Sequence, residues 1–222
     1  MVAAVRTLTA PKIVTDLIKW EAEPAYSREY GVLAANNPVV IGTALGKIAF
    51  GAVTSAAKSG GNTGNGTLTV DTTSPLLSGA TQGVYQVRYT SATAYQVTDP
   101  RGVVLGTGAN GTAFANRIKF NTAAGGTAFA AGDGFDVTVA KGSGKIVALN
   151  PLAVDGSAVC VGFSGMLRDP GNTDYSSGFW YIARAALLAD AGIVWPDGFT
   201  TAQIAQAMAE VAPVGLIARQ AI

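Results

Sequence analysis

The sequence predicts a mainly β protein with one helix near its C-terminus, in which a small β module carries an inserted β domain. Three observations support this fold class. Short segments of alternating apolar and polar residues are separated by turn residues. A stretch rich in Gly, Thr and Ala, residues 53–140, lies between two segments of different character. A capped amphipathic segment follows residue 199.

The chain divides into three parts by these patterns. Residues 1–30 are interrupted by prolines and lack a hydrophobic period, so we expect an extended N-terminal arm; a disordered terminus is the alternative. Residues 31–52 and 141–222 together form the β module with its C-terminal helix. Residues 53–140 form the inserted Gly- and Thr-rich domain, which we expect to project outward from the module.

The inserted domain shows short strands with turn signals between them, which predicts a small β-sandwich or barrel. Its expected strands are 67–70, 83–89, 94–98, 103–105, 118–120 and 135–139. The expected strands of the module are 39–41, 44–50, 146–149, 158–163 and 178–184. The Gly/Asn run at 58–67 is expected to be a linker, because it lacks the Gly-Lys-Ser/Thr ending of a phosphate-binding loop.

The C-terminal helix has the clearest local signals. Thr200 is its expected N-cap, and Gln203, three residues later, completes a capping box. Pro213 ends the helix, and residues 214–219 form a last strand. The spacing predicts one buried apolar stripe, formed by Ile204, Met208 and Val211.

Composition excludes several classes of partner. Charged residues make up 13% of the chain, about half the ~25% of an average soluble protein. A surface with so few charges is either covered by other chains or belongs to a Thr-rich β protein. The net charge of +1 and the scattered basic residues argue against nucleic acid binding. With no apolar run of about 20 residues and no secretory signal, we expect no membrane insertion and synthesis in the cytoplasm.

The residues needed for most catalytic sites are missing. The sequence contains no histidine, so Ser-His-Asp and Cys-His arrangements are excluded, and no acidic cluster has metal-binding spacing. Asp133 and Asp136 could act as an acid and base pair, but Asp133-Gly134 is typical of a turn. Cys160, the single cysteine, is expected to be a buried apolar thiol. We expect no enzyme activity, no metal and no cofactor.

Aromatic residues are the remaining candidates for binding. In the arm, Trp20, Tyr26 and Tyr30 need a partner surface, because the segment around them has no hydrophobic period. In the inserted domain, Tyr85 and Tyr89 share one face of a strand by parity. Together with Tyr95 they either stack on sugars or pack in the core of the domain.

Four short motifs outside the inserted domain point to a family when they are taken in order. They are Y-S-R-E at 26–29, G-T-A-L-G-K-I at 42–48, D-G-S-A-V at 155–159 followed by Gly162, and W-P-D-G at 195–198. This order resembles the head decoration proteins of tailed bacteriophages, of the phage lambda protein D type. The resemblance covers about residues 20–52 and 141–222.

The resemblance implies a structural protein that binds the outer surface of the expanded phage head, usually as a homotrimer. It would stabilise the major capsid protein lattice against DNA pressure. It implies capsid contacts in the arm at Trp20, Tyr26, Ser27, Arg28, Glu29 and Tyr30, and module or trimer contacts at Lys47, Trp195 and Pro196. The alternative function is a phage adhesin or carbohydrate-binding module, in which Tyr85, Tyr89 and Tyr95 contact a host-surface glycan.

Overall fold

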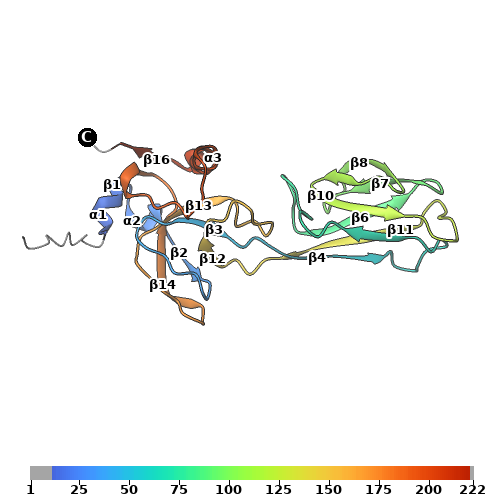
Figure 1. Cartoon of the computed structure of the whole chain (residues 1–222), viewed down its shortest axis with the longest axis horizontal. Coiled ribbons are helices and arrows are strands. Elements are labelled where there is room, and N and C mark those ends of the chain that lie inside the picture. The colour runs from blue at the N-terminus through green and yellow to red at the C-terminus, as the bar shows by residue number, and fades with distance from the viewer. Residues whose placement is uncertain (1–11, 221–222) are drawn as a thin grey trace, which may run out of the picture. The chain divides into compact units, whose positions relative to one another are not determined.

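The computed structural model describes residues 12–220 and divides the chain into two compact units (Figure 1). Unit 2 consists of Ile48–Ser143 and Ala153–Gly156, and unit 1 of the other described residues. The segment expected as an inserted domain, residues 53–140, falls within unit 2. Most regular structure is strand and the longest helix lies near the C-terminus, so the predicted fold class is confirmed.

Unit 1 is built around a closed barrel. The strands follow the order β12-β2-β14-β13-β3 around it. Their bounds are β2 (Arg28–Leu33), β3 (Ala44–Lys47), β12 (Ile146–Ala148), β13 (Cys160–Ser164) and β14 (Tyr175–Ile182). The pair β12 and β2 runs parallel, and the other pairs run antiparallel. The strand expected at 39–41 is instead a single bridge between Val39 and Arg168.

A small sheet and short helices complete unit 1. The strand β15 (Ala186–Ala189) pairs antiparallel with β1 (Ile18–Glu21) and parallel with β16 (Leu216–Arg219). The helices are α1 (Val14–Leu17), α2 (Pro24–Ser27) and α3 (Thr201–Val211), with 3-10 turns at Asp190–Gly192 and Ala212–Val214.

The helix α3 forms as its local signals predict. The Thr200 hydroxyl accepts a hydrogen bond from the Gln203 amide at 3.3 Å, and the Gln203 side chain accepts one from the Thr200 amide at 2.8 Å. This reciprocal pair is the predicted capping box. The apolar stripe is confirmed: Val211 is buried, Ile204 and Met208 are half-buried, and Ala207 widens the stripe.

Two groups of buried side chains hold unit 1 together. The first comes from the barrel strands and includes Leu33, Ile146 and Tyr181. The second joins barrel strand β13 to β15, β16 and α3, and includes Phe163 and Ile182. Since Tyr181 and Ile182 are neighbours on β14 and belong to different groups, the C-terminal end of this strand is covered on both faces.

The structure differs from the arm that we expected over residues 1–30. Residues 1–11 lie outside the described residues. From Ile18 onward the segment is paired within unit 1, because β1 pairs with β15 and β2 pairs with β14 of the barrel. The sequence pattern does not predict this pairing, because β1 and β2 are short and flank the one-turn helix α2.

Unit 2 is a β-sandwich. Its larger sheet has the order β4-β11-β6-β7-β8, and its smaller sheet has the order β5-β10-β9. The larger sheet is made of β4 (Phe50–Ala57), β6 (Gly83–Tyr89), β7 (Ala94–Thr98), β8 (Val104–Ala109) and β11 (Gly134–Lys141). The smaller is made of β5 (Thr67–Val70), β9 (Phe114–Asn116) and β10 (Ile118–Ala123). Side chains from both sheets share one core, which is rich in aromatic residues.

The Gly/Asn run at 58–67 is not the linker that we expected. The Asp133 carboxylate accepts hydrogen bonds from the amides of Thr63 at 2.9 Å and Gly64 at 3.0 Å. The Asn62 side chain exchanges two hydrogen bonds with Gly134, at 2.8 and 2.9 Å. Gly64 also lies against Phe129, where a side chain would clash. These contacts bind the run to the end of the sandwich. A prediction from composition does not detect them, because they join residues far apart in the sequence.

Candidate functional site

Three large aromatic side chains of unit 1 lie exposed between residues 20 and 30. Trp20 on β1 is 60% exposed, Tyr26 on α2 is 58% exposed and Tyr30 on β2 is 74% exposed. Exposed residues of this size are informative, because aromatic side chains gain most from burial at an interface. We call Trp20, Tyr26 and Tyr30 the exposed aromatic set.

The backbone that carries this set is fixed by the Glu21 carboxylate. It accepts hydrogen bonds from the buried Ser27 hydroxyl at 2.8 Å and from Arg28 Nε at 3.1 Å, and it forms an ion pair with Arg28. The Arg28 hydrogen bond lowers the pKa of Glu21, and Glu21 in turn raises the pKa of Arg28. The end of β1 is therefore tied to the start of β2 by charge.

Arg28 also organises the outside of the barrel around Trp180. Its guanidinium lies 4.3 Å from the centre of the Trp180 ring, a distance typical of cation–π contact. The indole packs on the backbone of Gly165, at a place where a Cβ atom would overlap it. Tyr30 is the direct cross-strand partner of Trp180, so the exposed Tyr30 ring continues this packed surface.

A second polar cluster fixes Glu29. The Glu29 carboxylate forms an ion pair with Arg184 and accepts a hydrogen bond from the Tyr181 hydroxyl at 2.9 Å. Arg184 donates a hydrogen bond to the Tyr26 carbonyl at 2.7 Å and lies 5.5 Å from the Tyr26 ring. Burial raises the pKa of Tyr181, so its hydroxyl keeps its proton and remains a donor.

The arm motif therefore has two kinds of residue. Ser27, Arg28 and Glu29 make contacts within unit 1, while Tyr26 and Tyr30 point their rings to solvent. All six predicted arm residues lie between residues 20 and 30, and the aromatic ones are the most exposed of them.

The three predicted module contacts, Lys47, Trp195 and Pro196, differ in how far they are accessible. Lys47 is exposed and lines a cleft of about 290 Å³ together with Glu29, Arg184 and Glu210. Trp195 is half-buried between Phe163 and Phe199, with ring centres 5.9 Å apart in each case. Pro196 is half-buried as well. Lys47 is thus accessible to a partner, whereas Trp195 mainly packs inside unit 1.

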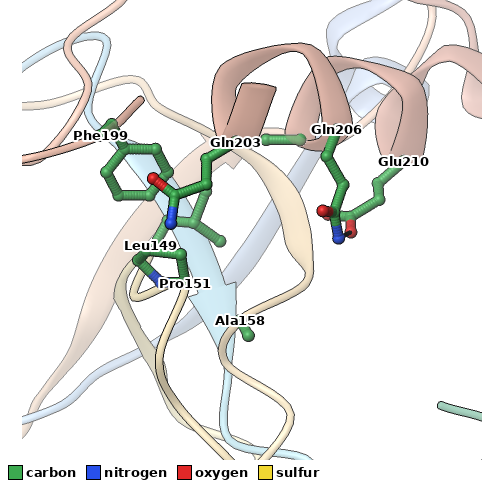
Figure 2. A pocket seen from close by; sticks show the side chains of 8 residues that line it. Leu149, Pro151, Ala158, Phe199, Gln203, Gln206 and Glu210 are labelled. Atoms are coloured by element: carbon green, nitrogen blue, oxygen red, sulfur yellow. Dashed lines mark hydrogen bonds between the residues drawn. The ribbon is translucent and has the colours of Figure 1, made fainter. Parts of the chain in front are cut away.

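A smaller hollow lies beside α3 (Figure 2). It measures about 140 Å³, with Leu149 and Phe199 among its apolar lining and with Gln203, Gln206 and Glu210 on the helix side. Glu210 and Gln206 are already bonded to each other at 3.1 Å, and Glu210 also accepts a hydrogen bond from the Cys160 amide at 2.7 Å. Through its bond to Cys160, Glu210 ties α3 to β13.

Of the two alternatives for Tyr85, Tyr89 and Tyr95, the structure agrees with core packing and not with a sugar-stacking face. All three rings are buried in the sandwich core. The parity argument was correct in placing Tyr85 and Tyr89 on one face, but that face is the inner one. Tyr89 stacks on Phe129 with ring centres 4.0 Å apart and donates a hydrogen bond to Asn110. The adhesin alternative loses the residues that supported it.

Other residues that the sequence singled out have structural roles. Cys160 is buried as predicted, and burial raises the pKa of its thiol to about 11, which keeps it protonated. Asp133 closes a turn that starts at Ala130, while Gly134 already begins β11, and hydrogen bonds to the Asp133 carboxylate from backbone amides, the one from Ala130 first, lower its pKa. Across residues 12–220 no group of His, Cys, Asp and Glu could hold a metal ion. Within the same range no helix has the length and apolar character to cross a membrane.

Among the exposed apolar residues of unit 1 that sequence reasoning missed are two leucines. Leu152 is 84% exposed in the loop after β12, and Leu167 is exposed in the loop after β13. Each is a single leucine among turn residues, so neither belongs to a periodic pattern that could have marked it.

Unit 1 thus presents a β surface with exposed aromatic rings, the kind of side chain that contributes most at protein interfaces. The family model described as "Bacteriophage lambda head decoration protein D" matches residues 7–216, and the chain therefore belongs to this family. It is a family of structural proteins of the phage capsid, which makes this chain a virion component.

Other comparisons add little. A search of curated proteins found no match. Two crystal structures of Xanthomonas campestris FlgL, in space groups H3 and C2, are 24% and 26% identical to this chain. They match 46% and 44% of it with TM-scores of 0.32 and 0.31. The matched part spans about a third of FlgL, 33% and 31%. A structural similarity this weak supports no conclusion about the fold or the function of this chain.

Proposed function

We propose that this protein binds the outer surface of the expanded phage head as a homotrimer and stabilises the major capsid protein lattice against the pressure of packaged DNA. It acts by binding alone, with no enzyme activity. Membership of the head decoration family supports the capsid role. The observation that carries the capsid contact is the exposed aromatic set on a backbone fixed by Glu21 and Arg184.

The fixed backbone matters because binding costs less when the contact residues are already ordered. Glu21 holds Ser27 and Arg28, and Arg184 holds the Tyr26 carbonyl. The rings at Tyr26 and Tyr30 therefore do not lose backbone entropy when they meet a partner. Aromatic and arginine side chains are also the residues that contribute most at protein interfaces.

The low content of charged residues also fits this function. A protein with 13% charged residues can bury surface against other chains without desolvating many ionised groups. Threefold assembly would add to this, because three linked weak contacts act together on the capsid. Residues 1–11, which precede the described part, are proposed to extend the contact.

The test is co-sedimentation of the purified chain with undecorated, expanded shells of its own phage. We expect saturable binding near one copy per capsid subunit. The triple variant Trp20→Ala, Tyr26→Ala, Tyr30→Ala should lose most of this binding, since each ring at an interface centre contributes about 2 kcal/mol or more. Val103 and Val104 are exposed residues of unit 2, so Val103→Ala, Val104→Ala is the matched control and should bind normally.

Two results would count against the proposal. A folded wild-type chain that does not bind expanded shells would remove the capsid contact altogether. Full binding by the triple aromatic variant would keep the capsid role but place the contact elsewhere on the chain. Circular dichroism and thermal melting of each variant would show that the fold is retained.

A further inference from the structure

The edges of the sandwich in unit 2 are not equally protected. Exposed edge strands can pair with other chains, and proteins usually shorten, charge or cover them. The strands β5 and β9, at the edges of the smaller sheet, have four and three residues. At the edge strand β8, the Leu105 carbonyl is covered by the Asn116 side chain at 2.8 Å. The fourth edge belongs to β4, which has eight residues (Figure 1).

The free side of β4 carries regularly spaced main-chain groups. The Lys58 amide donates to the Gly134 carbonyl at 3.0 Å, so even-numbered residues of this segment face β11. In an antiparallel ladder the alternate residues face the other way. Val53, Ser55 and Ala57 therefore direct their N–H and C=O groups to the free side, where no main-chain partner is found among residues 12–220.

The strand also lacks the residues that normally prevent pairing. Residues 50–57 contain no charge and no proline. Thr54 and Ala56 are exposed on the outer face of the sheet, and Ser55 binds the Leu68 carbonyl of the facing sheet at 3.3 Å. The Ser55 hydroxyl thus bridges to the facing sheet, while the main-chain groups of Ser55 remain open at the edge.

We propose that β4 pairs antiparallel with β4 of a second copy of this chain, joining two sandwiches edge to edge through a twofold axis. The strand β4 contains no charged residue, so a second copy of the same strand can pair with it without charge repulsion. With Ser55 facing Ser55 of the second copy, Lys58 lies opposite Ala52, so no like charges meet. Val53 then faces Ala57, and each of these pairs exchanges two main-chain hydrogen bonds.

The register makes a specific test possible. In this pairing Thr54 of one copy lies directly opposite Ala56 of the other, on the exposed face. The variant Thr54→Lys, Ala56→Lys places like charges opposite each other at both positions, whereas Thr54→Lys, Ala56→Glu places opposite charges there. Both variants change the same exposed residues of the full chain, so each is the control for the other's effect on folding.

The measurement is sedimentation equilibrium of the full chain over a wide concentration range, with amide exchange of residues 53, 55 and 57. We expect the wild-type species found at low concentration to associate in pairs as concentration rises, which doubles its mass. Exchange at these amides should slow over the same range. The Lys/Lys variant should weaken this step about tenfold or more, and the Lys/Glu variant should restore it.

Three results would overturn the pairing. The first is a wild-type chain whose mass and exchange do not change with concentration. The second is association that the Lys/Lys variant leaves intact. The third is a Lys/Glu variant as weak as Lys/Lys, which would exclude the Thr54–Ala56 register. Because no capsid is involved, each result is independent of the proposed capsid contact.

Discussion

The two units bury their strands in different ways, and this difference decides how visible each is in the sequence. In unit 2 the strands have one face in the core and one in solvent: along β6, Tyr85 and Val87 are buried while Val84 and Gln86 are exposed. Such strands alternate with period two. In unit 1 the strands β13 and β15 are covered on both faces and do not alternate.

The largest expected effect separates the two cores. Phe120 of unit 2 and Phe163 of unit 1 are both fully buried, in different groups of side chains. We expect Phe120→Ala and Phe163→Ala each to lower the free energy of unfolding of its own unit by about 3–5 kcal/mol. All three tryptophans, Trp20, Trp180 and Trp195, belong to unit 1, so tryptophan fluorescence during urea unfolding follows that unit alone.

Under this expectation Phe163→Ala shifts the fluorescence transition and Phe120→Ala does not. Hydrogen exchange of peptides from residues 83–98 provides the reverse measurement for unit 2. If Phe120→Ala shifts the fluorescence transition as much as Phe163→Ala does, the two units unfold together and the comparison fails.

A smaller effect is expected where each unit packs an aromatic ring on a glycine. Gly165 in unit 1 lies under Trp180, and Gly108 in unit 2 lies under Tyr95. A Cβ atom at either position would overlap the ring, so Gly165→Ala and Gly108→Ala should each cost about 1–3 kcal/mol. Denaturant unfolding measures both. Gly126→Ala is the control, because its Cβ would meet no atom within 4 Å.

For Gly165→Ala we also expect a red shift of tryptophan emission, because a displaced Trp180 ring becomes more exposed to water. The same emission in the variant and in wild type, with unchanged stability, would mean that the barrel adjusts around the new methyl group without cost.

The third expected effect compares how the units hold a carboxylate. Asp133 in unit 2 is held by backbone amides, and Glu21 in unit 1 by the Arg28 side chain. Both folded-state pKa values are lowered, so each group stabilises its unit above the unfolded pKa of about 4, and this stability is lost as pH falls through the folded pKa. Melting curves from pH 7 to pH 2 should show the loss in both units.

Salt separates the two mechanisms. The Glu21–Arg28 pair is an ion pair near the surface and should weaken in high salt, whereas backbone hydrogen bonds to Asp133 should weaken less. We expect Asp133→Asn to flatten the pH dependence of unit 2 and Glu21→Gln that of unit 1. An acid transition of unit 2 that persists unchanged in Asp133→Asn would assign the titration to another group.

The sequence predicted best where local chemistry decides the structure. The capping box at Thr200 and the strands 67–70, 83–89 and 94–98 were predicted at their observed bounds. These signals lie within a few residues of each other, or in one alternating face. The strand β4 was largely missed, because its exposed small residues show no alternation.

The candidate site was predictable in its residue types but not in their roles. The motif at 26–30 identified the region, yet only tertiary contacts show that Ser27 is buried and that Glu29 pairs with Arg184, 155 positions away. The role of the unit 2 tyrosines was left open for a related reason. Parity indicates which side chains share a face, but it does not indicate which face becomes the core.

The smallest expected effect tests the one helix signal that both sequence and structure support. Thr200→Ala removes the side chain that caps α3, so we expect a loss of about 1 kcal/mol in the free energy of unfolding of unit 1. Thr200→Ser keeps the hydroxyl and should stay near wild type. Urea unfolding followed by tryptophan fluorescence measures both variants. Because Ala207 and Val211 anchor α3 in the core, the helix should remain folded in both, and the loss should appear as a shifted midpoint with an unchanged slope. A changed slope would instead mean that α3 detaches when its cap is removed, and that packing alone does not hold it.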